Sequence, residues 1–88
     1  MCTSIAMKWG GGYFGRNMDV EYSFGEQVAV TPRRYPLRFW RQPDQEEHFA
    51  LIGMAHVAGG RPLYAEAANE KGLYMAGLNF PGSAWYEP

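Results

Sequence analysis

Small or polar residues alternate with apolar ones at the start of the chain, which is the pattern of a strand with one buried face. Ile5 and Met7 are the apolar positions, and the three consecutive glycines at 10–12 predict a turn. Tyr13 and Phe14 then begin a returning run. This opening segment therefore predicts a β-hairpin.

Four further segments predict strands, because each is a short apolar run bounded by proline, glycine or turn residues. They are residues 28–31, 49–57, 63–68 and 73–80. Residues 49–57 are the most apolar, so we expect them to form the best buried strand. The run Asn69-Glu70-Lys71-Gly72 predicts a turn with positive φ at its glycine, which joins the last two strands into a second hairpin.

The predicted elements are antiparallel hairpins without a convincing amphipathic helix, although residues 66–68 taken alone would suit a helical turn. Residues 37–41 lie between two prolines and predict an edge or loop segment. An apolar sheet face needs a second layer to cover it, and no segment supplies that layer. The chain has 88 residues, enough for one small domain and not for two. We therefore predict that residues 1–88 form a single incomplete domain.

Composition excludes several classes of protein. Hydrophobic residues make up 47% of the chain and charged residues 19%, which favours a folded chain over a disordered one. The single cysteine excludes a disulfide-stapled domain and a multi-cysteine zinc site. A net charge of −1 argues against nucleic acid as a partner.

The longest apolar stretch, 49–55, is too short to span a bilayer, so no membrane partner is expected. The chain opens without a secretory signal pattern, so we expect a cytoplasmic location.

Two motifs that could hold a cofactor or a metal are interpreted as structural. Gly10, Gly12 and Gly15 spell G-x-G-x-x-G, but no helix and no acidic residue follow at the spacing that a dinucleotide site requires. His48 and His56 stand eight positions apart with no cysteine partner, so they are expected to be surface or structural histidines. We therefore predict neither a cofactor nor a metal.

A cluster of basic residues lies between the third and fourth predicted strands. It comprises Arg33, Arg34, Arg38 and Arg41, and it is followed at once by Asp44, Glu46 and Glu47. An anion site is conceivable there. We prefer a solvated loop whose positive charge is neutralised by the acidic residues that follow it.

Cys2 has the most specific chemistry in the chain. Removal of Met1 is expected because the cysteine side chain is small, and it would leave a thiol and a free α-amine on the same residue. An α-amine titrates near 7.7–8.0, so it can act as a base around neutral pH. A nucleophile with a base on its own residue is the arrangement of an N-terminal nucleophile.

Arg16 and Asp19 lie on the returning arm of the first hairpin. If Cys2 and Met18 are opposite one another, both groups come within reach of the N-terminus. A guanidinium would favour the thiolate, and a carboxylate would hold the amine. On the spacing of the residues alone, a surface arginine and a turn aspartate are the alternative interpretation, and the catalytic one is not favoured over it.

Five blocks of the sequence together resemble the N-terminal part of the choloylglycine hydrolase family, which contains bile salt hydrolases and penicillin V acylases. They occur in the family's order and cover nearly the whole chain. The blocks are Met1-Cys2-Thr3, Phe14-Gly15-Arg16-Asn17-Met18-Asp19 with Glu21-Tyr22-Ser23-Phe24, Thr31-Pro32-Arg33, Asn69-Glu70-Lys71-Gly72-Leu73, and Ala76-Gly77-Leu78-Asn79-Phe80-Pro81.

The resemblance implies an α+β fold, in which these residues are the N-terminal part of the αββα sandwich of an N-terminal-nucleophile (Ntn) hydrolase. It also implies hydrolysis of a small-molecule amide, most specifically a glycine- or taurine-conjugated bile salt, without a cofactor. Family members are often homo-tetramers.

Each proposed site residue follows from a match to the family's motifs. Cys2 matches the nucleophile, Arg16 the arginine beside the thiol, and Asp19 the aspartate around the α-amine. Asn79 matches the position whose backbone N–H contributes to the oxyanion hole, and bile salt hydrolases resemble this chain in having asparagine there, where penicillin V acylases typically carry tyrosine. Candidates for the apolar wall that meets a steroid are Met18 and Phe24.

The chain also departs from the family in length. Family members are several times longer and carry a further oxyanion-hole asparagine and a further arginine downstream. We therefore expect these 88 residues to be an N-terminal fragment that is inactive alone. Two alternatives stay open: a penicillin V or acyl-homoserine-lactone acylase, and a non-catalytic β-rich fragment in which the site residues are idle.

Overall fold

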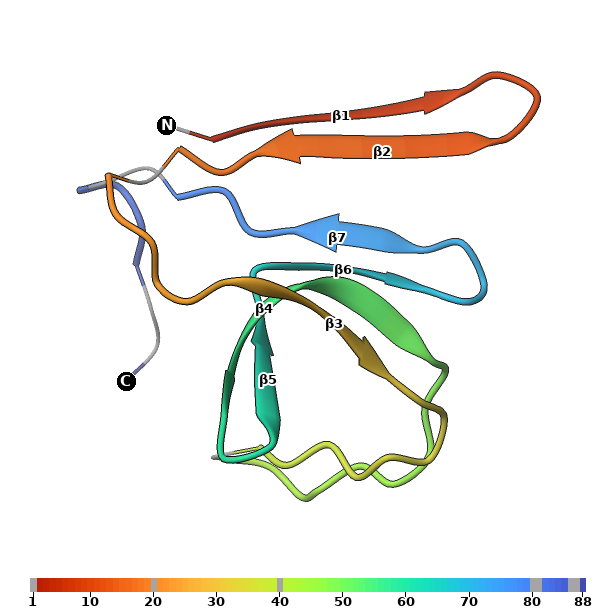
Figure 1. Cartoon of the computed structure of the whole chain (residues 1–88), viewed down its shortest axis with the longest axis vertical. Helices are drawn as coiled ribbons and strands as arrows, with labels where there is room; N and C mark the ends of the chain where they lie inside the picture. The colour runs from red at the N-terminus through yellow and green to blue at the C-terminus, as the bar shows by residue number, and fades with distance from the viewer. Residues whose placement is uncertain (1, 20, 40, 80–81, 86–87) are drawn as a thin grey trace.

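A computed structural model describes residues 2–19, 21–39, 41–79, 82–85 and 88 (Figure 1). This part of the chain contains strands and no helix, so no helix in it is long and apolar enough to cross a membrane. The strands are β1 (Thr3–Lys8), β2 (Gly12–Asn17), β3 (Gln27–Thr31), β4 (Leu51–Ala58), β5 (Arg61–Tyr64), β6 (Glu66–Asn69) and β7 (Tyr74–Ala76).

The first two strands form the predicted hairpin. β1 and β2 pair antiparallel from Thr3 opposite Asn17 to Lys8 opposite Gly12. The turn contains a glycine at positive φ, a conformation that glycine adopts without steric cost. Continued by one residue beyond the ladder, this register places Cys2 opposite Met18.

A second sheet contains the other five strands, in the order β3-β4-β6-β7, with β5 also paired to β4. The predicted strand at 28–31 is confirmed as β3, and 49–57 coincides largely with β4. The second predicted hairpin is confirmed by the antiparallel pairing of β6 with β7, with Gly72 at φ +91° in its turn. Residues 66–68 lie in β6, so their helical alternative is wrong. The final strand, β7, ends at Ala76 and is therefore shorter than the predicted strand at 73–80.

The predicted strand 63–68 is interrupted by a β-bulge. Ala55 pairs with Tyr64, and Ile52 pairs with Ala68. Between these pairs β4 contains two residues, whereas the opposing segment contains the three residues 65–67. One extra residue on one strand of an antiparallel pair defines a bulge, and it bends that strand. The bulge therefore divides the predicted strand into β5 and β6.

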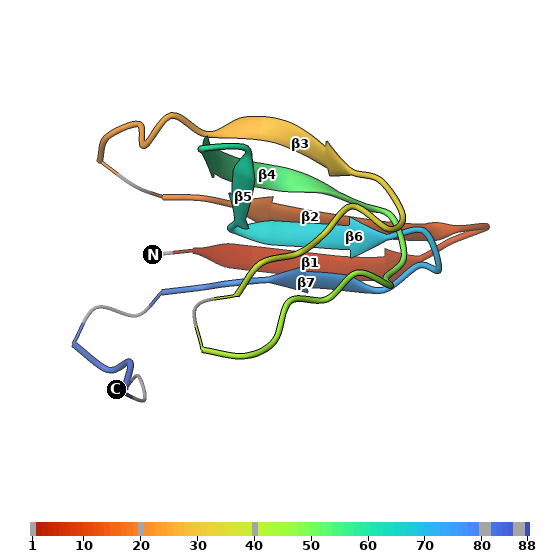
Figure 2. The ribbon, with the colours of Figure 1, turned by 90° about the horizontal axis from the view of Figure 1, so that it is seen from below.

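The hairpin and the five-stranded sheet lie side by side, with β2 next to β7 (Figures 1 and 2). The ring of Phe14 in β2 stacks on that of Tyr74 in β7, with centroids 5.6 Å apart and planes 9° apart. Arg16 adds hydrogen bonds across the same boundary. Among the described residues the two sheets share no ladder, so these side-chain contacts hold them together.

The chain buries little of its apolar surface. Among the described apolar residues only Ala55 is buried, and Thr31 on β3 is a buried polar residue. The segment that forms β4 was predicted to be the best buried strand. It contains the buried Ala55, but the side chain of Ile52 in the same strand is 50% exposed. Four apolar residues, on strands β3, β4 and β5, form an open apolar face of the sheet: Val28, Val30, Ile52 and Leu63. This face is open because the described residues provide no second layer.

The described residues between β3 and β4 (32–39 and 41–50) form a long loop that is attached to the opposite side of the sheet. The Tyr35 hydroxyl donates to the Gly60 carbonyl at 3.2 Å, and residues 37 and 45 form an isolated bridge. Both ring nitrogens of His48 lie within hydrogen-bonding distance of carbonyl oxygens, those of Phe49 and Tyr35, which raise the pKa of the imidazole. His48 therefore has a structural role, as the sequence suggested.

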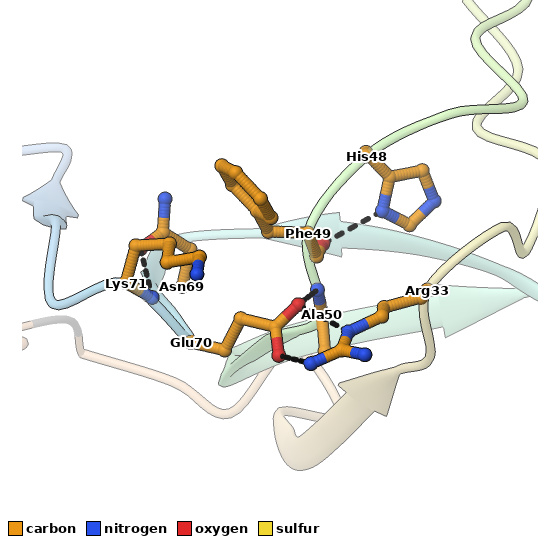
Figure 3. A network of polar contacts seen from close by, with 7 residues as sticks. All are labelled: Arg33, His48, Phe49, Ala50, Asn69, Glu70 and Lys71. Carbon is orange, nitrogen blue, oxygen red and sulfur yellow. Dashed lines mark hydrogen bonds and ion pairs between the residues drawn. The ribbon is translucent and has the colours of Figure 1, made fainter.

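The basic cluster is not neutralised in the way that the sequence suggested. Arg33 forms a bidentate ion pair with Glu70 in the β6–β7 turn (Figure 3), instead of pairing with the acidic residues that follow the cluster. Glu70 also accepts a hydrogen bond from the Ala50 N–H at 3.2 Å, and the Lys71 ammonium lies 5.5 Å from the centre of the Phe49 ring. The prediction that the following acidic residues neutralise the cluster was wrong for Arg33, because folding places Arg33 next to Glu70, 37 residues later in the sequence.

Candidate active site

Three of the residues predicted to be catalytic, Arg16, Asp19 and Asn79, lie around the thiol of the fourth, Cys2. Cys2 immediately precedes β1 and is a half-buried free thiol. The backbone N–H groups of Asp19 and Asn79 and the side chain of Arg16 face it closely enough to lower its pKa. The donors come from both sheets, since Asn79 follows β7 and the others belong to the hairpin.

These donors lower the pKa of the Cys2 thiol. The largest effect comes from the Asp19 N–H, followed by that of Asn79, while partial desolvation opposes them. The guanidinium of Arg16 adds a hydrogen bond and a favourable charge interaction. Donors of this kind favour the thiolate, which is the nucleophilic form of cysteine.

Arg16 is held by main-chain carbonyls. Its Nη1 donates to the Ala65 carbonyl at 3.2 Å, and its Nη2 donates to the Gly77 carbonyl at 2.8 Å. Ala65 lies in the bulge, and Gly77 directly follows β7. The five-stranded sheet therefore fixes the orientation of the Arg16 guanidinium. The same guanidinium lowers the pKa of the Cys2 thiol, which belongs to the hairpin side of the site.

Asp19 contacts the thiol through its main chain. The sequence assigned a different task to this residue, in which its carboxylate holds the α-amine. The Asp19 N–H, two residues after the end of β2, makes the largest contribution to the lowered pKa of the Cys2 thiol. The role of the carboxylate remains a prediction.

Met18 and Phe24, the two candidates for an apolar wall, are both half-buried. Met18 is opposite Cys2 in the continued hairpin register. Phe24 belongs to a tight turn, in which its N–H donates to Oε2 of Glu26 at 3.0 Å and the Ser23 hydroxyl donates to the same oxygen at 2.8 Å. The register thus favours a position for Met18 across from Cys2, and contact with a substrate remains a prediction for both residues.

Two cavities are lined by the long loop and the strands near it. One, of about 800 Å³, is lined by residues of the loop, of β4 and of the β6–β7 turn, and another, of about 650 Å³, lies between the loop and β5. Cys2 lines neither of them. No group of three His, Cys, Asp or Glu side chains in the described part of the chain could hold a metal.

Sequence reasoning missed the carbonyl groups of Ala65 and Gly77. Main-chain acceptors leave no trace in residue type, so their part in holding Arg16 could not be predicted from side-chain chemistry. The available signals were glycines, because Gly53 lies opposite the bulge and Gly77 beside it. A glycine inside a strand often marks a bulge or a close backbone approach.

The chain was compared with known families and proteins. A family model described as linear amide C–N hydrolases, choloylglycine hydrolase family, matches residues 2–88. The chain is 48% identical over 87 residues to the bile salt hydrolase/transferase of Lactiplantibacillus plantarum, covering 99% of this chain and 27% of that protein. It is 46% identical over 83 residues to the conjugated bile acid hydrolase of Lactobacillus gasseri, covering 92% and 26%. The chain spans about a quarter of the length of these curated relatives.

A solved structure has a similar arrangement. The crystal structure of the C2A mutant of the conjugated bile acid hydrolase from Clostridium perfringens matches with a TM-score of 0.85 and 37% sequence identity. The match covers 98% of this chain and 27% of that chain. It confirms the predicted fold class, since the strands coincide with a part of that larger fold.

Proposed function

Because the chain belongs to the choloylglycine hydrolase family of linear amide C–N hydrolases, we propose that it forms the nucleophile-bearing part of a hydrolase for glycine- or taurine-conjugated bile salts. The names of the relatives support this substrate class. The observation that carries the proposal is the surroundings of the Cys2 thiol, whose pKa is lowered by Asp19, Asn79 and an Arg16 that two main-chain carbonyls hold in place.

The first step of the proposed reaction is formation of an acyl-enzyme. After removal of Met1, the α-amine of Cys2 takes the thiol proton, and the thiolate attacks the amide carbonyl carbon. The electron pair of the carbonyl moves to its oxygen, which becomes an oxyanion. Collapse of this intermediate breaks the C–N bond, and the protonated α-amine gives its proton to the departing glycine or taurine nitrogen.

We assign the oxyanion contact to the Asn79 N–H, because Asn79 matches that position of the family's motif and its N–H is among the groups that lower the pKa of the Cys2 thiol. Losing one donor of this type typically costs about 2.7–4 kcal/mol of barrier. The family resemblance implies a further asparagine and a further arginine outside these 88 residues, so we propose that the chain alone is inactive.

Hydrolysis of the thioester completes the cycle. Water gives a proton to the α-amine and attacks the thioester carbonyl, and the Cys2 sulfur leaves. Arg16 stabilises that departing thiolate, because its guanidinium charge lowers the pKa of the Cys2 thiol. The products are the free bile acid and the amino acid released in the first step.

A chimera tests this proposal, in which the 88 residues replace the corresponding part of the Lactiplantibacillus plantarum relative. We expect it to release glycine from glycocholate, and Cys2→Ala to lower that rate by on the order of 10³-fold or more. Cys2→Ser is the matched control, since it keeps a hydroxyl in place of the thiol and should retain only residual activity. Retained turnover in the Cys2→Ala protein would sink the assignment.

Two further measurements sharpen the test. Intact mass must show that Met1 is absent from the active protein, because otherwise the α-amine is not on Cys2. Assays with penicillin V and an acyl-homoserine lactone, run beside glycocholate and taurocholate, decide among the substrates of the family. Higher kcat/KM for penicillin V than for either bile salt contradicts the proposed substrate class.

A further inference from the structure

The bulge at residues 65–67 has an unusual hydrogen-bonding pattern. In a regular antiparallel strand, the N–H and C=O of one residue face the same neighbouring strand. The Ala65 N–H instead donates to the Met54 carbonyl of β4 at 2.9 Å, while its carbonyl accepts from the Gly77 N–H on the β7 side at 2.9 Å. The extra residue of the bulge thus turns one carbonyl away from β4.

This bulge requires glycine on the opposing strand. A Cβ added to Gly53 would lie 2.0 Å from the Glu66 carbonyl oxygen and 2.9 Å from the Ala67 Cα. Both neighbours belong to the backbone of the bulge, so a flexible side chain cannot relieve the overlap. Gly53 and the extra residue therefore form one structural unit.

The Ala65 carbonyl, which faces away from β4, accepts hydrogen bonds from two groups near the site. It accepts from Nη1 of Arg16 at 3.2 Å in addition to the Gly77 N–H. The Gly77 carbonyl then accepts from Nη2 of the same arginine. Gly77 is two residues from Asn79, whose N–H reaches the Cys2 thiol. One carbonyl thus fixes both the guanidinium and the start of the segment that carries the Asn79 donor.

We infer that the bulge, with Gly53 and Ala65 as its positioning residues, aligns Arg16 and Asn79 on the Cys2 thiol. It acts through those two residues and does not touch a substrate. The inference rests on the proposed function, because positioning matters only if the thiol is the nucleophile. Bulges are over-represented beside active sites, where they redirect individual groups.

Deleting Glu66 removes the extra residue and allows a regular ladder. Ala65 and Ala67 then lie opposite Met54 and Gly53, and the pairs on either side keep their partners. The matched control is Glu66→Ala, which removes the carboxylate and keeps the bulge. The readout is the rate of iodoacetamide alkylation against pH, which reports Cys2 alone because the chain has one cysteine.

We expect the midpoint of the alkylation curve to rise in the Glu66 deletion and the rate at pH 7 to fall several-fold, because Arg16 and Asn79 lose their alignment. Glu66→Ala should keep the parent midpoint. A folded deletion variant, shown by an unchanged circular dichroism spectrum, with the parent midpoint overturns the inference. A stabilising role for the bulge would change the melting temperature and leave the midpoint where it is.

Two further measurements keep the inference testable if the deletion variant does not fold. Gly53→Ala should raise the alkylation midpoint, whereas Gly11→Ala, at a position with open space around its Cβ, should not. In the parent chain the Gly77 amide should exchange as slowly as the ladder amides of β6, and fast exchange overturns the inference. None of these readouts needs turnover, so the Cys2→Ala assay decides the proposed function separately.

Discussion

At the residue scale, Glu70 fastens the long loop to the β6–β7 turn. It pairs with Arg33 and accepts from the Ala50 N–H, and its own N–H donates to the Ala50 carbonyl at 3.1 Å. The hydrogen bond from Arg33, more than any other contact, lowers the pKa of the Glu70 carboxyl to about 2. The segment that begins at residue 32 and the strand that begins at residue 51 are thereby tied to one turn.

This lowered pKa predicts an acid-dependent stability. A carboxyl whose pKa is lower in the folded state contributes stability above its ordinary pKa of 4.5, and that contribution is lost as the pH falls toward 2. We expect Glu70→Gln to unfold at lower urea concentration than the parent at pH 7, with the difference disappearing toward pH 2. Urea titrations at several pH values measure it.

The control for Glu70 is Glu46→Gln, which removes the same charge from an exposed loop position. It should leave the urea midpoint nearly unchanged at every pH. A difference between Glu70→Gln and the parent that persists at pH 2 contradicts the role assigned to the ion pair.

At the scale of elements, the stacked rings of Phe14 and Tyr74 join the hairpin to the five-stranded sheet. Tyr74→Ala removes one ring, and we expect a loss of about 0.5–1.5 kcal/mol beyond the loss of buried area. Tyr74→Phe keeps the ring and should be close to the parent. Urea unfolding gives the free energies, and hydrogen exchange shows whether β1 and β2 open first.

The matched control for this contact is Met75→Ala on the next position of β7, which is exposed and faces the other side of the sheet. It should change the free energy of unfolding by less than Tyr74→Ala does. Equal losses in the two variants would show that the stack adds nothing specific to the joining of the sheets.

At the scale of the whole molecule, the open apolar face is the dominant feature. Val28 and Val30, on the edge strand β3, are 66% and 65% exposed. An exposed apolar face beside an unpaired strand edge favours association. We expect the isolated chain to self-associate, and light scattering with amide NMR measures it. Sharp, dispersed signals from a monomer would contradict this expectation.

A charge placed on the open apolar face tests its role in association. Val30→Lys should lower the apparent mass at a given concentration, because a lysine on an edge strand opposes pairing between chains. Gln27→Lys adds the same charge to the same strand at an alternate position and should have less effect. In the chimera we expect the remaining part of the relative to cover the open apolar face, so the chimera should not self-associate through that face.

Local patterns were sufficient to predict most of the strands. The alternation around Ile5 and the glycine-rich turn specify the first hairpin, and the Asn69–Gly72 turn specifies the second. These features depend on neighbours in the sequence, so the residues themselves reveal them. The bulge at 65–67 was not predicted, because its extra residue is defined only by the partner strand.

The sequence was enough to predict Cys2 as the reactive group and Arg16 and Asp19 as its neighbours, because all three lie in or directly beside one hairpin with a recognisable turn. The groups that lower the pKa of the thiol became clear only in the folded chain: the main-chain N–H groups of Asp19 and Asn79, and an Arg16 that the Ala65 and Gly77 carbonyls hold in place. The tertiary structure also decided that Arg33 pairs with Glu70. The reason is that main-chain direction and long-range pairing depend on strand register, which residue types alone do not specify.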